Sequence, residues 1–174
     1  MKIKGINDLD FINYKAPALY IAFNTCSFKC DKENGTELCH NRGLALEPDI
    51  EVEKEEIINR YILNPLSEAI VLGGLEPFDS PLDLLPFIDT LRRQYECDDP
   101  IIIYTGYTEE ELTSGHWGHG APSDQKTYWE NVISYGNIIV KFGRYRPNEE
   151  PHYDKILGVN LASDNQYAKK IGTA

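Results

Sequence analysis

The sequence has no long apolar run and little positive charge. No stretch of its 174 residues approaches the roughly 20 consecutive apolar residues that a membrane-spanning helix needs. It contains 17 lysines and arginines against 28 aspartates and glutamates, which gives a net charge of −11. A chain this acidic lacks the cationic stripe that binds a phosphate backbone. We therefore expect neither a membrane nor a nucleic acid as a partner.

Cysteine is also scarce, with four residues in the chain. Four are too few for the disulfide framework of a small secreted protein, and three of them lie in one short segment. The first residues, MKIKGINDLDF, contain no apolar signal core. These features predict a reduced, cytoplasmic protein. Because no repeat, low-complexity tract or linker divides the chain, we expect one domain over residues 1–174.

Short apolar runs alternate with helix-like segments along the chain. Five runs are typical of buried strands: 18–23, 69–72, 100–104, 137–142 and 155–159. Helical patterns lie between them: 53–63, 81–95, a short helix opened by a Thr108–Glu111 capping box, and 126–135. The stretch 114–125 has the composition of a loop. This order predicts an α/β fold with a mostly parallel sheet covered on both faces.

Chemically distinctive segments follow four of the predicted strands directly. They are Cys26, Gly73-Gly74, Thr105-Gly106 and Gly143-Arg144. In parallel α/β sheets, ligands bind outside the carboxyl ends of the strands. We therefore expect the four segments to converge on one edge of the sheet and to form a site there.

Three cysteines, Cys26, Cys30 and Cys39, lie in the loop after the first buried run. Three residues separate the first two and eight separate the second pair. Three thiolates leave one position open at a metal centre that uses four ligands. The spacing alone is compatible with a structural zinc completed by His40, with an electron-transfer iron–sulfur protein, and with a catalytic iron–sulfur centre.

The motifs, taken in order, resemble the radical S-adenosylmethionine superfamily, and within it the activating proteins of anaerobic ribonucleoside-triphosphate reductases. The resemblance covers most of the chain and rests on Cys26, Cys30, Leu38-Cys39-His40-Asn41, Gly73-Gly74-Leu75-Glu76-Pro77, Ile102-Ile103-Tyr104-Thr105-Gly106-Tyr107, Phe142-Gly143-Arg144-Tyr145 and Asn165-Gln166. Two departures stand out. The second cysteine gap is six residues longer than the two of the family pattern C-x3-C-x2-C, and Leu75 is inserted in the GGEP-like element. The tight-turn signal Asn34-Gly35 predicts that the chain folds back there and returns Cys39 near Cys30.

The resemblance implies a single domain with an incomplete radical-SAM barrel, a 4Fe–4S cluster held by the three cysteines, and S-adenosylmethionine bound at the open iron. The implied reaction releases a 5′-deoxyadenosyl radical, which takes a hydrogen atom from a glycine and leaves a glycyl radical. The glycines would let their backbone carbonyls approach the ligand amine. The residues implied to bind the cofactor are Leu38, Cys39, His40, Gly73, Gly74, Glu76, Tyr104 and Thr105.

The implied partners are the large glycyl-radical reductase subunit and a flavodoxin- or ferredoxin-like electron donor. Lys29, Lys32 and Arg42 are predicted to form a cationic rim that steers an acidic donor. Activation of another glycyl-radical enzyme and a small-molecule radical reaction are alternatives within the same chemistry. A zinc-stabilised binding module is the alternative from a different class. Cys97 is interpreted as a free thiol, and the pair His116 and His119 as incidental.

Overall fold

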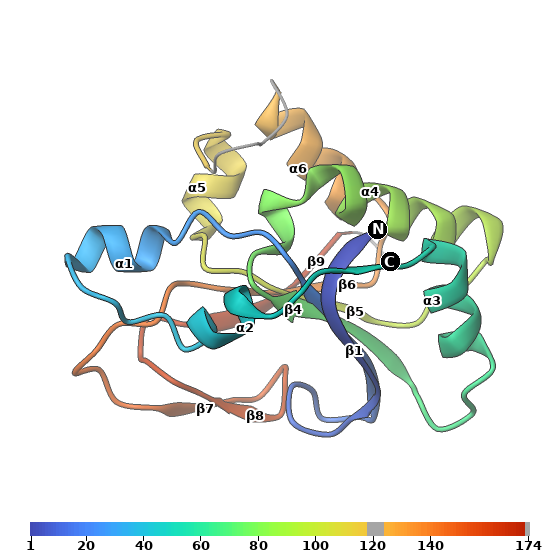
Figure 1. Ribbon diagram of the computed structural model, residues 1–174, viewed down its shortest axis with the longest axis horizontal. Coiled ribbons are helices and arrows are strands. Elements are labelled where there is room, and N and C mark those ends of the chain that lie inside the picture. The colour runs from blue at the N-terminus through green and yellow to red at the C-terminus, as the bar shows by residue number, and fades with distance from the viewer. Residues whose placement is uncertain (118–123, 173–174) are drawn as a thin grey trace.

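The computed structural model describes residues 1–117 and 124–172. Within them, seven strands form one sheet in the order β3-β1-β2-β4-β5-β6-β9 (Figure 1). Their bounds are β1 Lys2–Asp10, β2 Ala18–Phe23, β3 Ile50–Glu51, β4 Ala69–Gly74, β5 Ile101–Tyr104, β6 Ile138–Phe142 and β9 Tyr167–Ile171. Strands β2, β4, β5 and β6 are parallel, whereas β1, β3 and β9 pair antiparallel with their neighbours. The sheet is therefore mixed, with a parallel centre and antiparallel edges.

The parallel strands are nearly continuous apolar runs because both of their faces are buried. Every residue of β4 and β6 is buried, and β4 lies in register between β2 and β5. Strand 18–23 is confirmed, strand 69–72 extends through the two glycines to residue 74, and the runs 100–104 and 137–142 are confirmed to within one residue. This parallel centre directs the ends of four strands to one edge.

Four of the helices lie where the sequence patterns predicted them, whereas α1 and α2 lie in and just after the cysteine loop, where no helix was predicted. Their bounds are α1 Lys29–Asn34, α2 Arg42–Leu46, α3 Lys54–Ile62, α4 Pro81–Asp89, α5 Glu109–Ser114 and α6 Gln125–Ser134, with single turns at Pro77–Asp79 and Thr90–Gln94. The α4 helix continues into the second of these turns, a π-helical one, so the predicted helix 81–95 is confirmed almost to its end. The capping box of Thr108 and Glu111 is present at the start of α5. Among the described residues no helix is long and apolar enough to cross a membrane.

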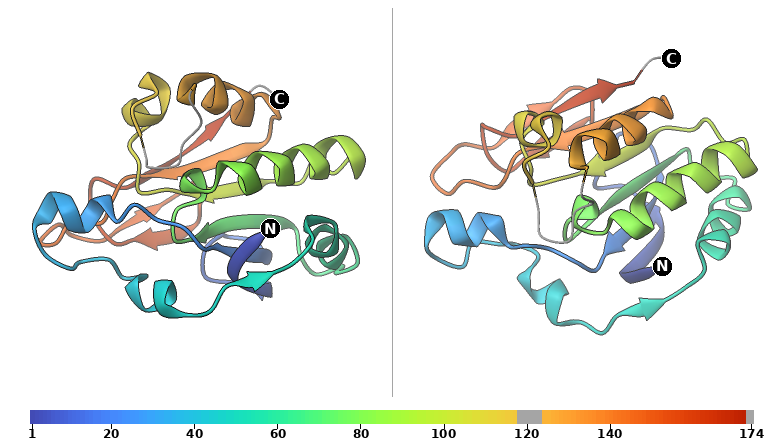
Figure 2. Two further views of the ribbon diagram at one scale, coloured as in Figure 1. Left: turned by 45° about the horizontal axis from the view of Figure 1, so that its top comes forward. Right: turned by 90° about the horizontal axis from the view of Figure 1, so that it is seen from above.

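Both faces of the sheet are covered, as predicted, but helices cover only one of them. Side chains of α3, α4, α5 and α6 pack with the sheet in the larger apolar core (Figure 2). The opposite face is covered by the segment that follows β1 and by the hairpin of β7 (His152–Asp154) and β8 (Val159–Leu161). Tyr14, Leu157 and Leu161 supply the apolar contacts of this thinner layer.

The predicted strand 155–159 is wrong. Residues 155–158 form the turn between β7 and β8, in which Gly158 has a left-handed φ of 75°. Strands β1 and β9 were not indicated by the apolar runs because they lie near or at the sheet edges, where polar side chains face water. The strand order ends at β3 and β9, and the incomplete barrel stays a prediction.

Candidate metal centre

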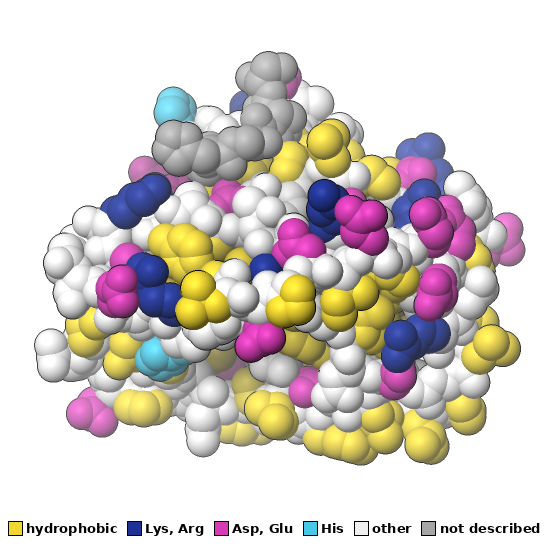
Figure 3. Space-filling model, in the orientation of Figure 1, with side chains coloured by type: hydrophobic (Ala, Val, Ile, Leu, Met, Phe, Trp, Pro, Cys, Tyr) yellow, Lys and Arg dark blue, Asp and Glu magenta, His cyan; other side chains and the backbone are white. Residues whose placement is uncertain are grey.

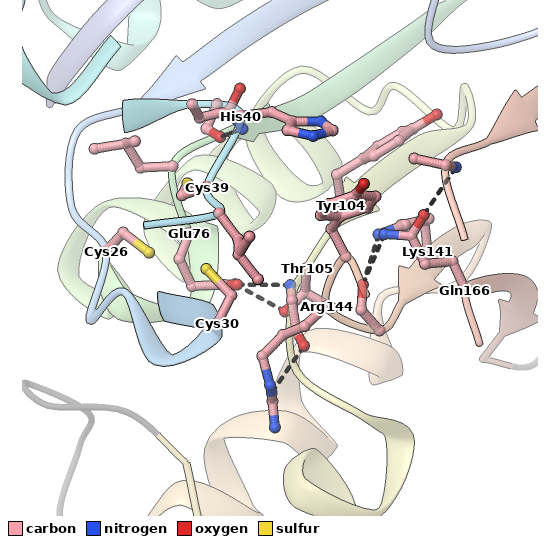
Figure 4. Close-up of a pocket in the computed structure, with 18 of the residues that line it drawn as sticks. Cys26, Cys30, Cys39, His40, Glu76, Tyr104, Thr105, Lys141, Arg144 and Gln166 are labelled. Carbon is pink, nitrogen blue, oxygen red and sulfur yellow. Dashed lines mark hydrogen bonds between the residues drawn. The ribbon is translucent and has the colours of Figure 1, made fainter. Parts of the chain in front are cut away.

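A cavity of about 270 Å³ lies at the carboxyl ends of the parallel strands (Figure 4). Its walls come from the loop after β2, the end of β4, the end of β5 and the segment after β6. All three clustered cysteines line it, from different points of the loop after β2. The predicted convergence of the four strand ends is therefore found in the structure.

Cys26 is held at the edge of the sheet by the residue that follows it. The backbone N–H of Ser27 donates to Asp79 Oδ2 at 2.6 Å, and the hydroxyl of Tyr107 donates to Asp79 Oδ1 at 2.6 Å. Asp79 and Tyr107 are both buried, so this contact fixes the start of the loop to the turn after β4 and to the segment after β5. Burial raises the pKa of the Cys26 thiol to about 12.

The long gap between Cys30 and Cys39 closes on the carboxylate of Asp31. Helix α1 carries Cys30 and ends at the predicted turn, where Gly35 has a φ of 66°. Asp31 Oδ1 then accepts the backbone N–H groups of Leu38 at 2.8 Å and of Cys39 at 2.9 Å, while Oδ2 accepts from Arg42. The six extra residues therefore make a helical turn and return, as the turn signal predicted.

The thiols of Cys30 and Cys39 are close enough to share a hydrogen bond. That bond raises the pKa of Cys30 and lowers the pKa of Cys39 to about 6. The pair therefore loses its first proton more readily than a separate thiol would, and one of the two sulfurs is available as a thiolate. Thiolates are the form in which cysteine binds a metal.

The two glycines at the end of β4 have different roles. Gly74 lines the cavity with a left-handed φ of 82°, and a Cβ there would lie 2.7 Å from Ala22 Cα. Its carbonyl accepts a hydrogen bond from Asn41 Nδ2 at 2.6 Å, which ties the segment after Cys39 to the sheet. Gly73 does not line the cavity; it gives room to the ring of Tyr20, 3.1 Å from the position of a Cβ.

Glu76 points into the cavity despite the inserted Leu75, but its oxygens are bonded within the protein. Oε1 accepts from the Thr105 hydroxyl at 2.8 Å and Oε2 from the Gly106 N–H at 2.8 Å. Burial, reinforced by the charge of Asp79, raises the pKa of Glu76 to about 8 against these hydrogen bonds. The hydroxyl of Thr105, predicted to reach a ribose, is thus used to hold Glu76.

Three further predicted residues line the same cavity. Leu38, whose backbone N–H donates to Asp31, directly precedes Cys39. The hydroxyl of Tyr104 donates to the backbone carbonyl of Asn13 at 2.6 Å. The imidazole of His40 packs against the ring of Tyr145 in a tilted arrangement, with ring centroids 4.4 Å apart and an angle of 42° between the ring planes. These side chains form apolar and aromatic walls around the thiols.

Lys141 is a cavity residue that the sequence did not single out, whereas its neighbour in the cavity, Gln166, belongs to the Asn165-Gln166 pair of the resemblance. Lys141 is 8% exposed, and its Nζ donates to the carbonyl of Gly143 at 2.7 Å. Gln166 Nε2 donates to the same carbonyl at 3.1 Å. Burial lowers the pKa of Lys141 to about 8. A lysine within the apolar run IIVKF was the one available signal, since a buried strand rarely carries a charge without a use.

The predicted cationic rim is not a region of net positive charge. Lys29 pairs with Glu111, and Arg42 pairs with Asp31 and with Glu37 at 3.3 Å. Figure 3 shows side chains of both signs next to one another on the side that carries α1 and α2. Steering of an acidic electron donor by these cations is therefore not supported.

The zinc alternative requires at least three ligands close to one ion. Zinc–sulfur bonds of about 2.3 Å would place the sulfurs of a zinc site about 3.8 Å apart. In residues 1–117 and 124–172, no group of three cysteine, histidine or acidic side chains is close enough to hold one ion. Cys97 is packed in the helix-side core next to Asp99, and His119 lies outside the described residues. In a cubane, by contrast, each cysteine binds a separate iron.

Comparison with known proteins identifies the same chemistry. Residues 18–166 match the family model of a 4Fe–4S single cluster domain. No curated protein matches the sequence. The matched region covers well over half of the chain and contains all three cavity cysteines together with the four parallel strands. The chain therefore belongs to the family of 4Fe–4S single cluster domains and is an iron–sulfur protein.

Proposed function

We propose that this protein is a radical S-adenosylmethionine enzyme whose 4Fe–4S cluster is bound by Cys26, Cys30 and Cys39. The observation that carries the proposal is the placement of exactly these three thiols beside a cavity of about 270 Å³ that no fourth described cysteine enters. A cluster with three protein thiolates keeps one iron for a small ligand. The cavity supplies the space in which that ligand would lie.

The bound cofactors supply the chemistry: one electron from the reduced cluster cleaves a carbon–sulfur bond of the sulfonium, giving methionine and a 5′-deoxyadenosyl radical that takes a hydrogen atom from carbon. The chain binds and orients them. Asp31, Asp79 and Asn41 fix the three parts of the cysteine loop to the fold. Leu38 and Tyr104 give the cavity walls that exclude water.

The remaining predicted cofactor contacts are part of this proposal. The residues are Leu38, Cys39, His40, Gly74, Glu76, Tyr104 and Thr105, all of which line the cavity. Gly73 acts indirectly: a glycine at this position leaves room for the ring of Tyr20, which lines the cavity. An incomplete barrel, with the parallel strands as its wall, would present these groups to one open side.

The proposed substrate is a glycine of the large subunit of an anaerobic ribonucleotide reductase, in the cytoplasm, with a flavodoxin- or ferredoxin-like protein as electron donor. Loss of a hydrogen atom from the glycine Cα to the deoxyadenosyl carbon gives 5′-deoxyadenosine and leaves the unpaired electron on the glycine. Another glycyl-radical enzyme or a small molecule would serve the same chemistry. The motif resemblance, rather than the cavity, favours the reductase.

Anaerobic reconstitution tests the proposal. We expect about four iron and four sulfide atoms per chain in the unmodified protein and in Cys97→Ala, and loss of the cluster in Cys26→Ala, Cys30→Ala and Cys39→Ala. With dithionite and S-adenosylmethionine, the loaded protein should release 5′-deoxyadenosine. A loaded cluster that never releases this product would overturn the enzyme proposal while leaving the iron–sulfur family intact.

A further inference from the structure

A second cavity adjoins the metal centre. It has a volume of about 360 Å³ and lies between the end of α1, the start of α5 and the segment that follows β6. Arg144 and Tyr145 line both this cavity and the first one. The packing of Tyr145 against His40 places the shared wall next to Cys39. A molecule that fills the second cavity would therefore contact Arg144 and Tyr145, which also form a wall of the first cavity.

Arg144, one of the two residues of the shared wall, is held by ion pairs. Arg144 donates to both oxygens of Glu33 on α1, at 2.7 and 2.9 Å, and to both oxygens of Glu111 on α5, at 2.7 and 2.8 Å. Glu33 lies between Cys30 and Cys39, in the gap that is six residues longer than in the family pattern. The Arg144 part of the wall is thus one guanidinium bonded to two carboxylates, one on α1 and one on α5.

The charges of the second cavity are balanced, which argues against a phosphate ligand. Its two arginines are each paired with a carboxylate, Arg144 with Glu33 and Arg146 with Glu149 at 3.3 Å. Phosphate recognition requires uncompensated cations. The other polar side chains are uncharged amides and a hydroxyl: Asn34, Thr108, Asn148 and Asn165. All but Asn148 already make a hydrogen bond to another described residue of the chain.

Side chains of this kind match a polypeptide backbone, which presents N–H donors and carbonyl acceptors in equal number. In the described residues, Asn148 is exposed and its side chain makes no hydrogen bond. We propose that the second cavity receives an extended polypeptide segment of the partner protein and leads it past Arg144 to the metal centre. This inference rests on the proposed function, since it supplies the route for a glycine-bearing chain.

The test fills the second cavity and separates cofactor cleavage from radical transfer. Arg146→Trp places an indole at its rim, where the arginine side chain is 59% exposed, and Arg146→Ala removes the same ion pair without filling the space. Leu82→Trp, at an 88% exposed position near the start of α4 that does not line the second cavity, controls for an added indole. Each reconstituted variant is given dithionite and S-adenosylmethionine, with and without the purified large reductase subunit.

We expect all variants to release 5′-deoxyadenosine without the subunit within about twofold of the unmodified protein, because position 146 lies outside the first cavity. With the subunit, the glycyl radical measured by electron paramagnetic resonance should fall about tenfold or more in Arg146→Trp and stay near normal in Leu82→Trp. Arg146→Ala, which loses the ion pair but leaves the space open, should lose less than Arg146→Trp. Asn148→Trp, on the same segment, should repeat the loss.

A normal glycyl radical yield in both tryptophan variants of the cavity would overturn the inference. If the unmodified protein releases no 5′-deoxyadenosine at all, the proposed function fails first and the inference fails with it. Normal cleavage with blocked transfer supports both.

Discussion

At the scale of single residues, the carboxylate of Asp31 determines where Cys39 lies. It accepts two backbone N–H groups and the Arg42 guanidinium, and these hydrogen bonds lower the pKa of Asp31 although its burial opposes the change. A charged carboxylate therefore replaces the short connection that a two-residue gap would provide. The sequence signal was the Asn34-Gly35 turn, which indicated the return but not the residue that fixes it.

Replacing Asp31 should release the third cysteine. A hydrogen bond to a charged group contributes about 1.5–3 kcal/mol, so Asp31→Ala should lower cluster content several-fold after reconstitution. Asp31→Asn keeps an acceptor oxygen and should lose less. Iron and sulfide analysis measures both, and Glu37→Gln is the control because Glu37 contacts the same arginine at 3.3 Å from an exposed position. Equal iron content in Asp31→Ala and Glu37→Gln would contradict this role.

Glu76 gives the metal-free protein a pH dependence of known sign. Burial raises its pKa from 4.5 to about 8, so between these values the folded chain keeps a proton that the unfolded chain releases. The free energy of unfolding should then fall as pH rises through this window, by about 1.4 kcal/mol for each unit of pKa difference. Urea unfolding at pH 5 and pH 8 should show this loss in the unmodified protein and a smaller one in Glu76→Gln. Parallel curves for the two proteins would rule it out.

At the scale of elements, the end of β4 requires glycine for a steric reason. Gly74 combines a left-handed φ of 82° with a neighbour 2.7 Å from the position of a Cβ, whereas Gly43 in α2 has no atom within 4 Å. Gly74→Ala should lower the free energy of unfolding by about 2–4 kcal/mol, from backbone strain and overpacking. Gly43→Ala should be neutral or raise it by up to about 1 kcal/mol. Urea unfolding of both variants decides, and equal stabilities would show that β4 can shift to accept the methyl group.

The elements show which patterns are readable in a sequence. The parallel strands were predicted because burial on both faces leaves unbroken apolar runs, and α5 because its capping box is local. Strand β9, with the sequence YAKKI, and strand β1 carry exposed polar side chains that an apolar-run criterion passes over. The run 155–159 was misread because Leu157 and Val159 are apolar in order to pack a hairpin onto the second face of the sheet.

In the candidate site, too, some features could be predicted from local sequence patterns and others could not. Motif positions placed the three cysteines, Glu76, Tyr104 and Thr105 at one cavity, because strand order in a parallel sheet fixes where strand ends meet. Lys141 was not predicted, since its depth in the cavity depends on pairing between β5 and β6 that no local pattern encodes. Which oxygen binds which hydroxyl, as in the contact of Thr105 with Glu76, is likewise a property of the folded chain.

At the scale of the whole molecule, the antiparallel edges and the helices on one face leave the cysteine loop, the ends of the parallel strands and the second cavity together at one edge. Membership of the 4Fe–4S single cluster family requires a cluster, and the loop offers three thiolates for it. The central claim is therefore that one iron is left for S-adenosylmethionine.

Electron paramagnetic resonance of the dithionite-reduced, reconstituted protein tests this claim directly. The unmodified protein and Cys97→Ala should show the same reduced-cluster signal, and adding S-adenosylmethionine should change its g values in both, because the ligand binds an iron of the cluster. A signal that S-adenosylmethionine leaves unchanged, or one that is lost in Cys97→Ala, would mean that the cluster has four protein ligands and would contradict the account.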